Sequence, residues 1–212
     1  MVLKTSFTTL VVATLAAFSS YTPQAEAHSW AECVDWKFNK GGKQDWSDEG
    51  GKCLGYARRF PLNQPFGSLD SWWPARHYVQ DSNNPNFTMP CNHYAYGGQF
   101  GRMTVTSVGD TLCARWPAKN HAVPVFPGSH NTILINLSKT PNSKDVSQAE
   151  LMKNTIATLK FNNCNSVYPN TDRRACGGCF KVPPREKGTY LLQWRWLIED
   201  GKAYTSCADI QI

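Results

Sequence analysis

Eight cysteines constrain the fold of this chain of 212 residues more than any other feature of its sequence. An even number of cysteines in an oxidising compartment is typical of a disulfide framework. The pairing does not follow from the sequence, because eight cysteines allow on the order of a hundred connectivities. The cysteines are Cys33, Cys53, Cys91, Cys113, Cys164, Cys176, Cys179 and Cys207.

The first residues predict export into such a compartment. Lys4 supplies a positive charge, an apolar run follows over residues 10–18, and Ala25-Glu26-Ala27 has the small-x-small pattern of a signal-peptidase site. The apolar run is too short to cross a bilayer as a helix. We therefore expect residues 1–27 to be a secretory signal peptide and residues 28–212 to form one secreted, monomeric domain.

The spacing of two cysteines also allows a different interpretation. Cys176-Gly-Gly-Cys179 resembles half of a structural zinc site. A secreted chain with six further cysteines favours disulfides over zinc.

Hydrophobic periodicity changes along the chain. Residues 28–101 are rich in Gly, Pro, Asn and Trp and show little periodicity, which predicts long loops held by disulfides. Alternating or β-branched apolar patterns then predict strands over 103–106, 111–116, 132–137, 190–198 and 203–212. Short strands at this spacing favour a mainly β fold, an immunoglobulin-like β-sandwich with long disulfide-pinned loops.

One short helix is predicted within this β pattern. Ser147-Gln148-Ala149-Glu150 is a capping-box sequence. Leu151, Met152, Ile156 and Leu159 follow at helical spacing.

The formal net charge is +6 and is spread along the chain. A diffuse positive field favours an anionic partner, and secretion argues against nucleic acid. A charge of this size also serves solubility alone.

Cleavage after Ala27 would leave His28 as the first residue. An N-terminal histidine offers a metal two nitrogens, because its α-amine has a pKa of about 8 and loses its proton readily to a metal. One further imidazole would complete a planar set of three nitrogens, which favours Cu(II). By itself, a histidine at this position is a weak signal.

Four other histidines are candidates for the second imidazole. We favour His121, which follows the strand ending at Trp116 by a short loop. Such a loop lies at one end of a sandwich, where functional sites gather. His93 is the main alternative, whereas His77 and His130 are more typical of surface or loop histidines.

Three motifs, in this order, resemble those of lytic polysaccharide monooxygenases, which hold copper in a histidine brace. They are His28-Ser29-Trp30, then Gly109-Asp110-Thr111 with Trp116-Pro117-Ala118-Lys119-Asn120-His121, and finally Tyr204-Thr205-Ser206-Cys207. The resemblance covers the mature chain. It implies one copper ion bound by His28 and His121, an axial Tyr204, O2 or H2O2 as co-substrate, and an external electron donor.

The cysteine-rich first third and the stretch 116–121 look most like the oomycete pectin-cleaving group, auxiliary activity family seventeen. This resemblance implies oxidative cleavage of homogalacturonan, the polygalacturonate backbone of pectin in the plant cell wall. The positive charge suits such a polyanion. The same chemistry on cellulose or chitin, a non-catalytic copper- or carbohydrate-binding protein, and a disulfide-rich structural protein are the alternatives.

The chain departs from the fungal cellulose-active branch at two positions. That branch carries a His on the penultimate strand and a Gln before the axial tyrosine, where this chain has Trp194 and Lys202. Gln193 and Arg195 share one face of the same strand and are our candidates for the residue that contacts the bound co-substrate. An ordinary solvent-facing strand edge is the alternative for both.

Basic side chains near the predicted copper site are candidates for substrate binding, because Arg and Lys pair with galacturonate carboxylates. Lys119 and Asn120 adjoin His121, and Arg58 and Arg59 lie in the loop-rich first third.

Two sequons, at Asn86 and Asn136, are candidates for glycosylation. The second lies in an apolar run that predicts a strand.

We expect the secreted protein to begin with His28, because the signal-peptidase pattern ends at Ala27. Edman degradation should read His-Ser-Trp, and metal analysis should find one copper ion per chain. A start at any other residue would remove the free amine from the predicted site and contradict the copper assignment.

Overall fold

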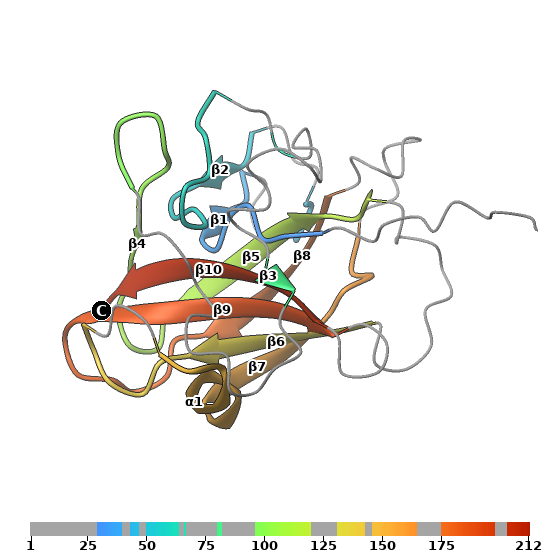
Figure 1. Ribbon diagram of the computed structural model, residues 1–212. Coiled ribbons are helices and arrows are strands. Elements are labelled where there is room, and N and C mark those ends of the chain that lie inside the picture. The colour runs from blue at the N-terminus through green and yellow to red at the C-terminus, as the bar shows by residue number, and fades with distance from the viewer. Residues whose placement is uncertain are drawn as a thin grey trace, which may run out of the picture.

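The computed structural model describes residues 29–39, 43–46, 50–63, 66, 80–81, 96–119, 131–142, 146–164, 175–197 and 203–212. The predicted signal peptide, Cys91, the sequon at Asn86 and all five histidines lie outside these residues. Strands account for most of the regular structure (Figure 1). Within the described ranges, no helix is long and apolar enough to cross a membrane.

The larger sheet contains six strands, and its strands pair antiparallel except where β4 runs parallel to β10. In spatial order its main path is β3 (Gln80–Asp81), β10 (Ala203–Gln211), β9 (Thr189–Leu197), β6 (Thr132–Leu137) and β7 (Thr155–Lys160), with β4 (Thr104–Val105) beside the end of β10.

Two smaller antiparallel pairs complete the strands. β5 (Thr111–Pro117) pairs with β8 (Ala175–Lys181) along its whole length, and Figure 1 shows this pair crossing behind the larger sheet. β1 (Trp36–Lys37) pairs with β2 (Lys52–Cys53).

The core lies between the larger sheet and the β5–β8 pair. Alternate side chains of both layers point into it, including Trp116 of β5, Phe180 of β8, Ile135 of β6 and Trp194 of β9. Burying one such side chain contributes roughly 1.5–3 kcal/mol to folding. Two β layers around a shared apolar core form a sandwich, so the predicted fold class is confirmed.

The helix α1 (Gln148–Lys153) begins where the capping sequence predicts. Ser147 Oγ accepts a hydrogen bond from the backbone N–H of Glu150 at 3.1 Å. The helix is shorter than its apolar spacing suggests. Asn154 ends it, and the segment with Ile156 and Leu159 is strand β7, because pairing with β6 overrides the local helical pattern.

Strand β8 has no counterpart among the predicted strands. Its Cys176-Gly177-Gly178-Cys179 segment has little β propensity. The structure explains the glycines, because a Cβ on Gly177 would lie 2.2 Å from the Trp46 ring and one on Gly178 would lie 2.9 Å from Leu159. Packing of neighbouring side chains onto the backbone therefore requires this sequence.

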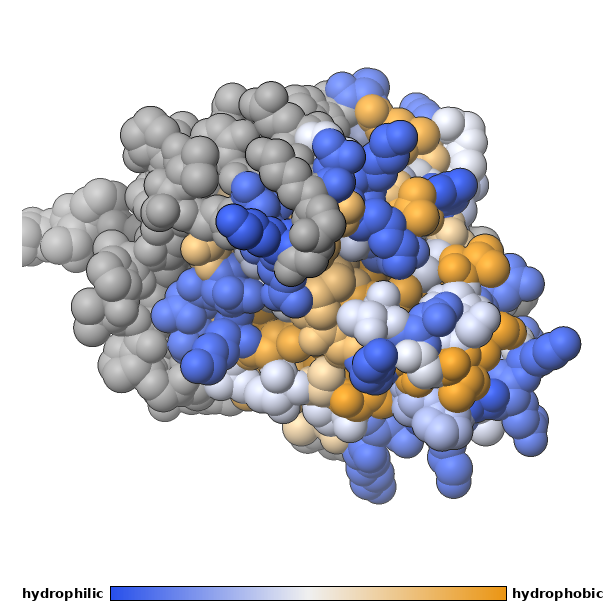
Figure 2. Space-filling model, turned by 180° about the vertical axis from the view of Figure 1, so that it is seen from behind, coloured by the Kyte–Doolittle hydropathy of each residue, from blue (hydrophilic) through white to orange (hydrophobic). Residues whose placement is uncertain are grey.

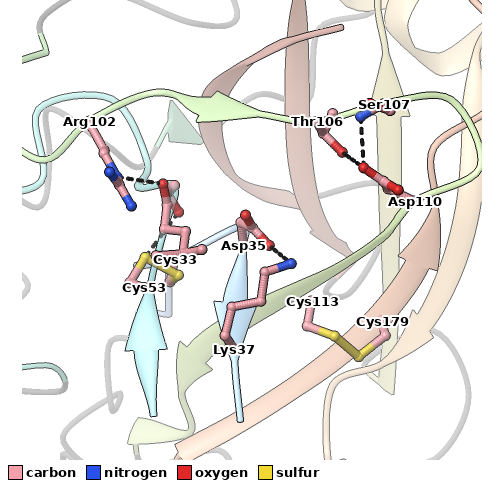
Figure 3. A network of polar contacts seen from close by, with 12 residues as sticks. Cys33, Asp35, Lys37, Cys53, Arg102, Thr106, Ser107, Asp110, Cys113 and Cys179 are labelled. Carbon is pink, nitrogen blue, oxygen red and sulfur yellow. Dashed lines mark hydrogen bonds and ion pairs between the residues drawn. A yellow bond between two sulfur atoms is a disulfide. The ribbon is translucent and has the colours of Figure 1, made fainter. Parts of the chain in front are cut away.

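The described cysteines form disulfides, as predicted. Three have both partners in the described ranges, and Cys207 is also disulfide-bonded. Both members of the Cys-x-x-Cys pair are used in this way, so the zinc alternative fails. The three bridges are Cys33–Cys53, Cys113–Cys179 and Cys164–Cys176. Figure 3 shows the first two.

A buried amide network joins β6, β9 and α1. Gln193 Oε1 accepts hydrogen bonds from Asn136 Nδ2 at 2.9 Å and from Gln148 Nε2 at 3.1 Å. Gln193 Nε2 donates to Gln148 Oε1 at 2.7 Å. Asn136 is fully buried, and its Nδ2 is the atom that a glycan would occupy. In the folded protein this atom is enclosed and hydrogen-bonded to Gln193, and glycosylation at Asn136 stays a prediction.

A buried ion pair attaches the loop around Arg58 to β10. Arg58 Nε and Nη2 donate to the two carboxylate oxygens of Asp209, both at 2.7 Å, and each side chain is 3% exposed. The Asp209 backbone N–H donates to Tyr96 Oη at 2.8 Å. Burial, and then the nearby Asp209 carboxylate, raise the pKa of Tyr96 well above its usual range, so its phenol stays neutral.

Arg58→Met should destabilise the protein by about 3–5 kcal/mol, because it leaves a buried carboxylate without its cation. Arg59→Met is the matched control, since Arg59 is half-buried and the charge change is identical. Urea unfolding with the disulfides intact measures the difference. Equal stabilities of the two variants would contradict the structural role of the Arg58–Asp209 pair.

Candidate functional site

The first described residues join the two layers of the sandwich at one end, on the right in Figure 1. Ser29 Oγ donates a hydrogen bond to the Pro117 carbonyl at the end of β5, at 2.6 Å. The Ala31 N–H donates to Ser206 Oγ of β10 at 3.0 Å. Ser29 and Ser206 are buried, which makes both bonds costly to lose.

A cation–π contact reinforces the same junction. The Lys119 ammonium lies 4.9 Å from the centroid of the Trp30 ring, and Trp30 is fully buried against Phe60. Lys119 adopts a left-handed backbone conformation with φ of 48°. A non-glycine residue in this region is uncommon, and such positions often lie at functional sites. The contact orients the Lys119 side chain at the end of β5.

Tyr204 lies at the beginning of β10, at the same end of the sandwich. It pairs with Trp196 of β9, and the two rings stack with centroids 5.8 Å apart. Tyr204 is half-buried at the margin of the core and, by strand alternation, shares its face with Ser206. Its side chain is thus held on the interior face of the sheet.

The three sequence motifs therefore come together. The residue after His28, the residues just before His121 and the face of β10 that carries Tyr204 are linked by the contacts above. His28, Asn120 and His121 themselves lie outside the described residues, as do His77, His93 and His130.

The described part of the chain offers no other metal site. It contains no group of three or more His, Cys, Asp or Glu side chains able to hold an ion. The described cysteines are all in disulfides, so no thiolate competes for a metal there.

The structure corrects the roles predicted for Gln193 and Arg195. They share one face of β9, as expected, but the opposite face carries Trp194 and Trp196 into the core, where Tyr204 packs. The amide of Gln193 is already used in the buried network with Asn136 and Gln148. Because successive strand residues point to opposite faces, neither side chain is directed toward a co-substrate beside Tyr204.

Arg58 also differs from its prediction. Its ion pair with Asp209 and its burial remove it from contact with substrate. Arg59 instead has a φ of 59° and places its guanidinium 5.6 Å from the centroid of the Phe100 ring. Together with Lys119, it is one of two half-buried basic side chains in left-handed backbone positions that lie over aromatic rings.

Aromatic side chains of the described residues do not form an exposed flat face. Six of the eight tryptophans are buried, and the large exposed apolar side chains are Leu62, Val105, Val108 and Met152. Seen from behind, hydrophilic and apolar residues are interspersed over the described surface (Figure 2). The other two tryptophans, Trp72 and Trp73, lie outside the described residues.

Ser206 and the contact between Trp30 and Lys119 were not identified as site features from the sequence. These residues belong to the sequence motifs or adjoin them, but the sequence does not show which of them contact one another. Only the approach of residues 29–31 to β5 and β10, which are far apart in sequence, gives them a role.

A scan against protein-family models finds no match to this sequence, and a search of curated proteins finds none either. Solved structures give partial similarity. A cellulose-active lytic polysaccharide monooxygenase in complex with copper is 16% identical, with 52% of this chain and 53% of that chain covered and a TM-score of 0.39.

Two further structures are similar to the same degree. A lytic polysaccharide monooxygenase from Streptomyces lividans is 15% identical, covers 54% of this chain and 62% of its own, and has a TM-score of 0.36. The catalytic domain of one from Listeria monocytogenes is 18% identical, with 52% and 59% covered and a TM-score of 0.35. The matched region spans less than two thirds of each of these three chains. Similarity at this level does not establish an activity.

Proposed function

We propose that this protein is a secreted, copper-dependent polysaccharide monooxygenase in which His28 and His121 would hold the metal and Tyr204 would lie beside it. The hydrogen bond from Ser29 to Pro117 is the observation that carries the proposal. Ser29 directly follows His28, and Pro117 precedes His121 by four residues, which span at most roughly 14 Å of chain. The two predicted ligands are thus tied to one short stretch of the molecule.

Tyr204 is tied to the same stretch through β10. Ser206 accepts the hydrogen bond from Ala31, and Tyr204 is two residues away on the same face, at about 7 Å along the strand. The ring of Tyr204 stacks on Trp196, so its orientation is held before any metal binds. An aromatic ring in this position would shield one side of the metal site from other ligands.

The donor set suits copper. A free α-amine and two neutral imidazoles are all available near neutral pH, and planar nitrogen donors favour Cu(II) over the other divalent metals. When bound and reduced by an external donor, copper supplies the oxidation of a C–H bond beside a glycosidic bond, with O2 or H2O2 as oxidant. The hydrogen bonds of Ser29 and Ser206 position the start of the mature chain. The cation–π contact with Trp30 positions the Lys119 ammonium.

Homogalacturonan is the substrate that the described residues favour. Lys119 is oriented next to the predicted metal ligand, Arg59 is ordered over Phe100, and the net charge is +6. Both cations suit the carboxylates of a galacturonate chain. Binding to cellulose or chitin generally uses flat aromatic faces, and the described aromatic side chains are buried or half-buried.

The reaction itself is tested on a panel of polygalacturonate, cellulose and chitin with ascorbate, and mass spectrometry identifies oxidised products. EDTA should abolish the activity, and added copper should restore it. If oxidised cellulose or chitin oligomers formed and oxidised galacturonides did not, the proposed chemistry would stand and the proposed substrate would be wrong. Full activity in a metal-free sample would refute the proposal.

Ser29→Ala should weaken Cu(II) binding by about tenfold, the lower range for residues that orient metal ligands. The substitution removes the bond to Pro117, which is the described contact with β5 nearest to the predicted terminus. Competition calorimetry measures the affinity, and Cu(II) electron paramagnetic resonance reports the geometry. Thr106→Ala is the control, because its side-chain bond to Asp110 lies at the opposite end of the sandwich. Unchanged copper affinity in Ser29→Ala would refute the positioning role.

Binding to polygalacturonate should weaken more steeply with salt than binding to a neutral glucan, because screening acts on exposed charge pairs. Lys119→Gln should flatten that salt dependence. Lys181→Gln is the control, since Lys181 is exposed and its ammonium donates to the Gly109 carbonyl at the opposite end of the sandwich. Equal salt dependence for the two polymers would count against an anionic substrate.

A further inference from the structure

Three arginines are buried in the described part of the chain, and two of them have anionic partners. Arg58 is 3% exposed and binds Asp209. Arg115 is 9% exposed, donates from Nη1 to Glu32 at 3.0 Å, and lies between the rings of Trp36 and Phe66 at 4.9 and 4.7 Å. Burial of a cation is normally compensated in this way.

Arg195 is the exception. It is 6% exposed, its Nε is fully enclosed without an acceptor, and no described residue forms a hydrogen bond or ion pair with its guanidinium. Burial lowers its pKa, and no carboxylate among the described residues offsets that effect. A guanidinium N–H enclosed in this way is costly, because it loses hydration without gaining an acceptor.

The surroundings of Arg195 are defined by the larger sheet. It pairs with Leu134 of β6 and Thr205 of β10, in the middle of three strands. The next residue on its face of β9, Gln193, is already bonded to Asn136 and Gln148. Arg195 lies two residues before the end of β9, about 7 Å along the strand, at the end of the sandwich where Tyr204 begins its strand.

We propose that Arg195 is an anion-binding residue that receives a carboxylate from outside the protein, namely that of a uronic acid in the polysaccharide. The choice of uronic acid rests on the proposed function, whereas the anion site rests on the unpaired guanidinium. A guanidinium binds a carboxylate with two parallel N–H···O bonds and is less strongly hydrated than an ammonium, which makes it the better buried anion receptor. The ligand would supply the charge that the described residues lack.

This proposal assigns Arg195 a different role from contact with the copper co-substrate. The guanidinium lies on the outer face of β9, and Tyr204 packs on the inner face. A polysaccharide that lies across this end of the sandwich would contact Arg195 on the outer face of the larger sheet. It would also contact Lys119, which follows the end of β5. Arg195 therefore adds a carboxylate subsite and would favour an anionic chain over a neutral one.

Calorimetry with trigalacturonate tests the site in the mature protein, with and without copper. Arg195→Met should weaken binding about tenfold or more, and Arg195→Lys should restore it only in part, because lysine keeps the charge but loses the two-bond geometry. Arg185→Met is the control, as this half-exposed arginine at the opposite end of the sandwich also lacks a carboxylate partner. Galactotriose, which has no carboxylate, should bind equally to wild type and Arg195→Met.

Thermal unfolding separates an external anion from an internal ion pair. Without ligand, Arg195→Met should melt no lower than wild type, because no partner is lost, whereas Arg58→Met should melt clearly lower. A large drop in Arg195→Met would reveal an internal carboxylate partner and overturn the proposal. Unchanged trigalacturonate binding in Arg195→Met would overturn it as well.

Small anions identify the source of the carboxylate. At constant ionic strength, trigalacturonate should raise the melting temperature more than acetate or phosphate in an Arg195-dependent manner. Equal effects of all three would refute the uronic acid assignment in favour of free anions. Failure of the copper chemistry alone would leave trigalacturonate binding to the metal-free protein intact, so the two proposals fail separately.

Discussion

The hydrogen bond between Ser29 and the Pro117 carbonyl is the contact on which the arrangement of this molecule's candidate site depends. Together with the bond from Ala31 to Ser206, it places the start of the described chain across both layers of the sandwich. Neither partner is exposed, so water cannot replace these bonds without opening the structure. The same geometry positions Lys119 over Trp30 and brings the region before His121 close to the residue after His28. A catalytic metal bound through a chain terminus needs such an anchor, because termini are otherwise among the least ordered parts of a protein.

Among the described residues, two of the three buried arginines form an ion pair with a carboxylate, and Arg195 does not. Asp209 neutralises Arg58, and Glu32 neutralises Arg115, and in both pairs the arginine attaches the loop-rich first third to the sandwich. These pairs act beside the apolar clusters that the first third forms around Trp30, Trp36 and Trp46. Arg195 follows neither pattern, and it lies near the sandwich end that the other contacts organise. Among the described residues, the two arginines with structural ion pairs thus differ from the proposed anion-binding arginine by the presence of a carboxylate partner.

The sequence predicted the strands at 111–116, 132–137, 190–198 and 203–212 well, because period-two patterns are local. It predicted that Gln193 and Arg195 share a face, which is correct, but not which face points into the core. Both faces of β9 are buried, so the residue types along the strand do not show which face points into the core. Pairing of β7 with β6 overrode the helical spacing of Ile156 and Leu159. Strand β8 forms by pairing with β5, and its glycines leave room for Trp46 and Leu159 to pack on it.

By itself, the sequence determined the number of cysteines, the capped helix and the order of the three motifs that contain His28, His121 and Tyr204, and it predicts an export signal. Each of these features depends on residues that are neighbours in the sequence. Only the tertiary structure decided which cysteines pair, why the Asn136 side chain is enclosed, and why adjacent Arg58 and Arg59 have different roles. These depend on contacts between distant segments, such as Arg58 and Asp209, which are 151 residues apart, and no local pattern encodes such a distance.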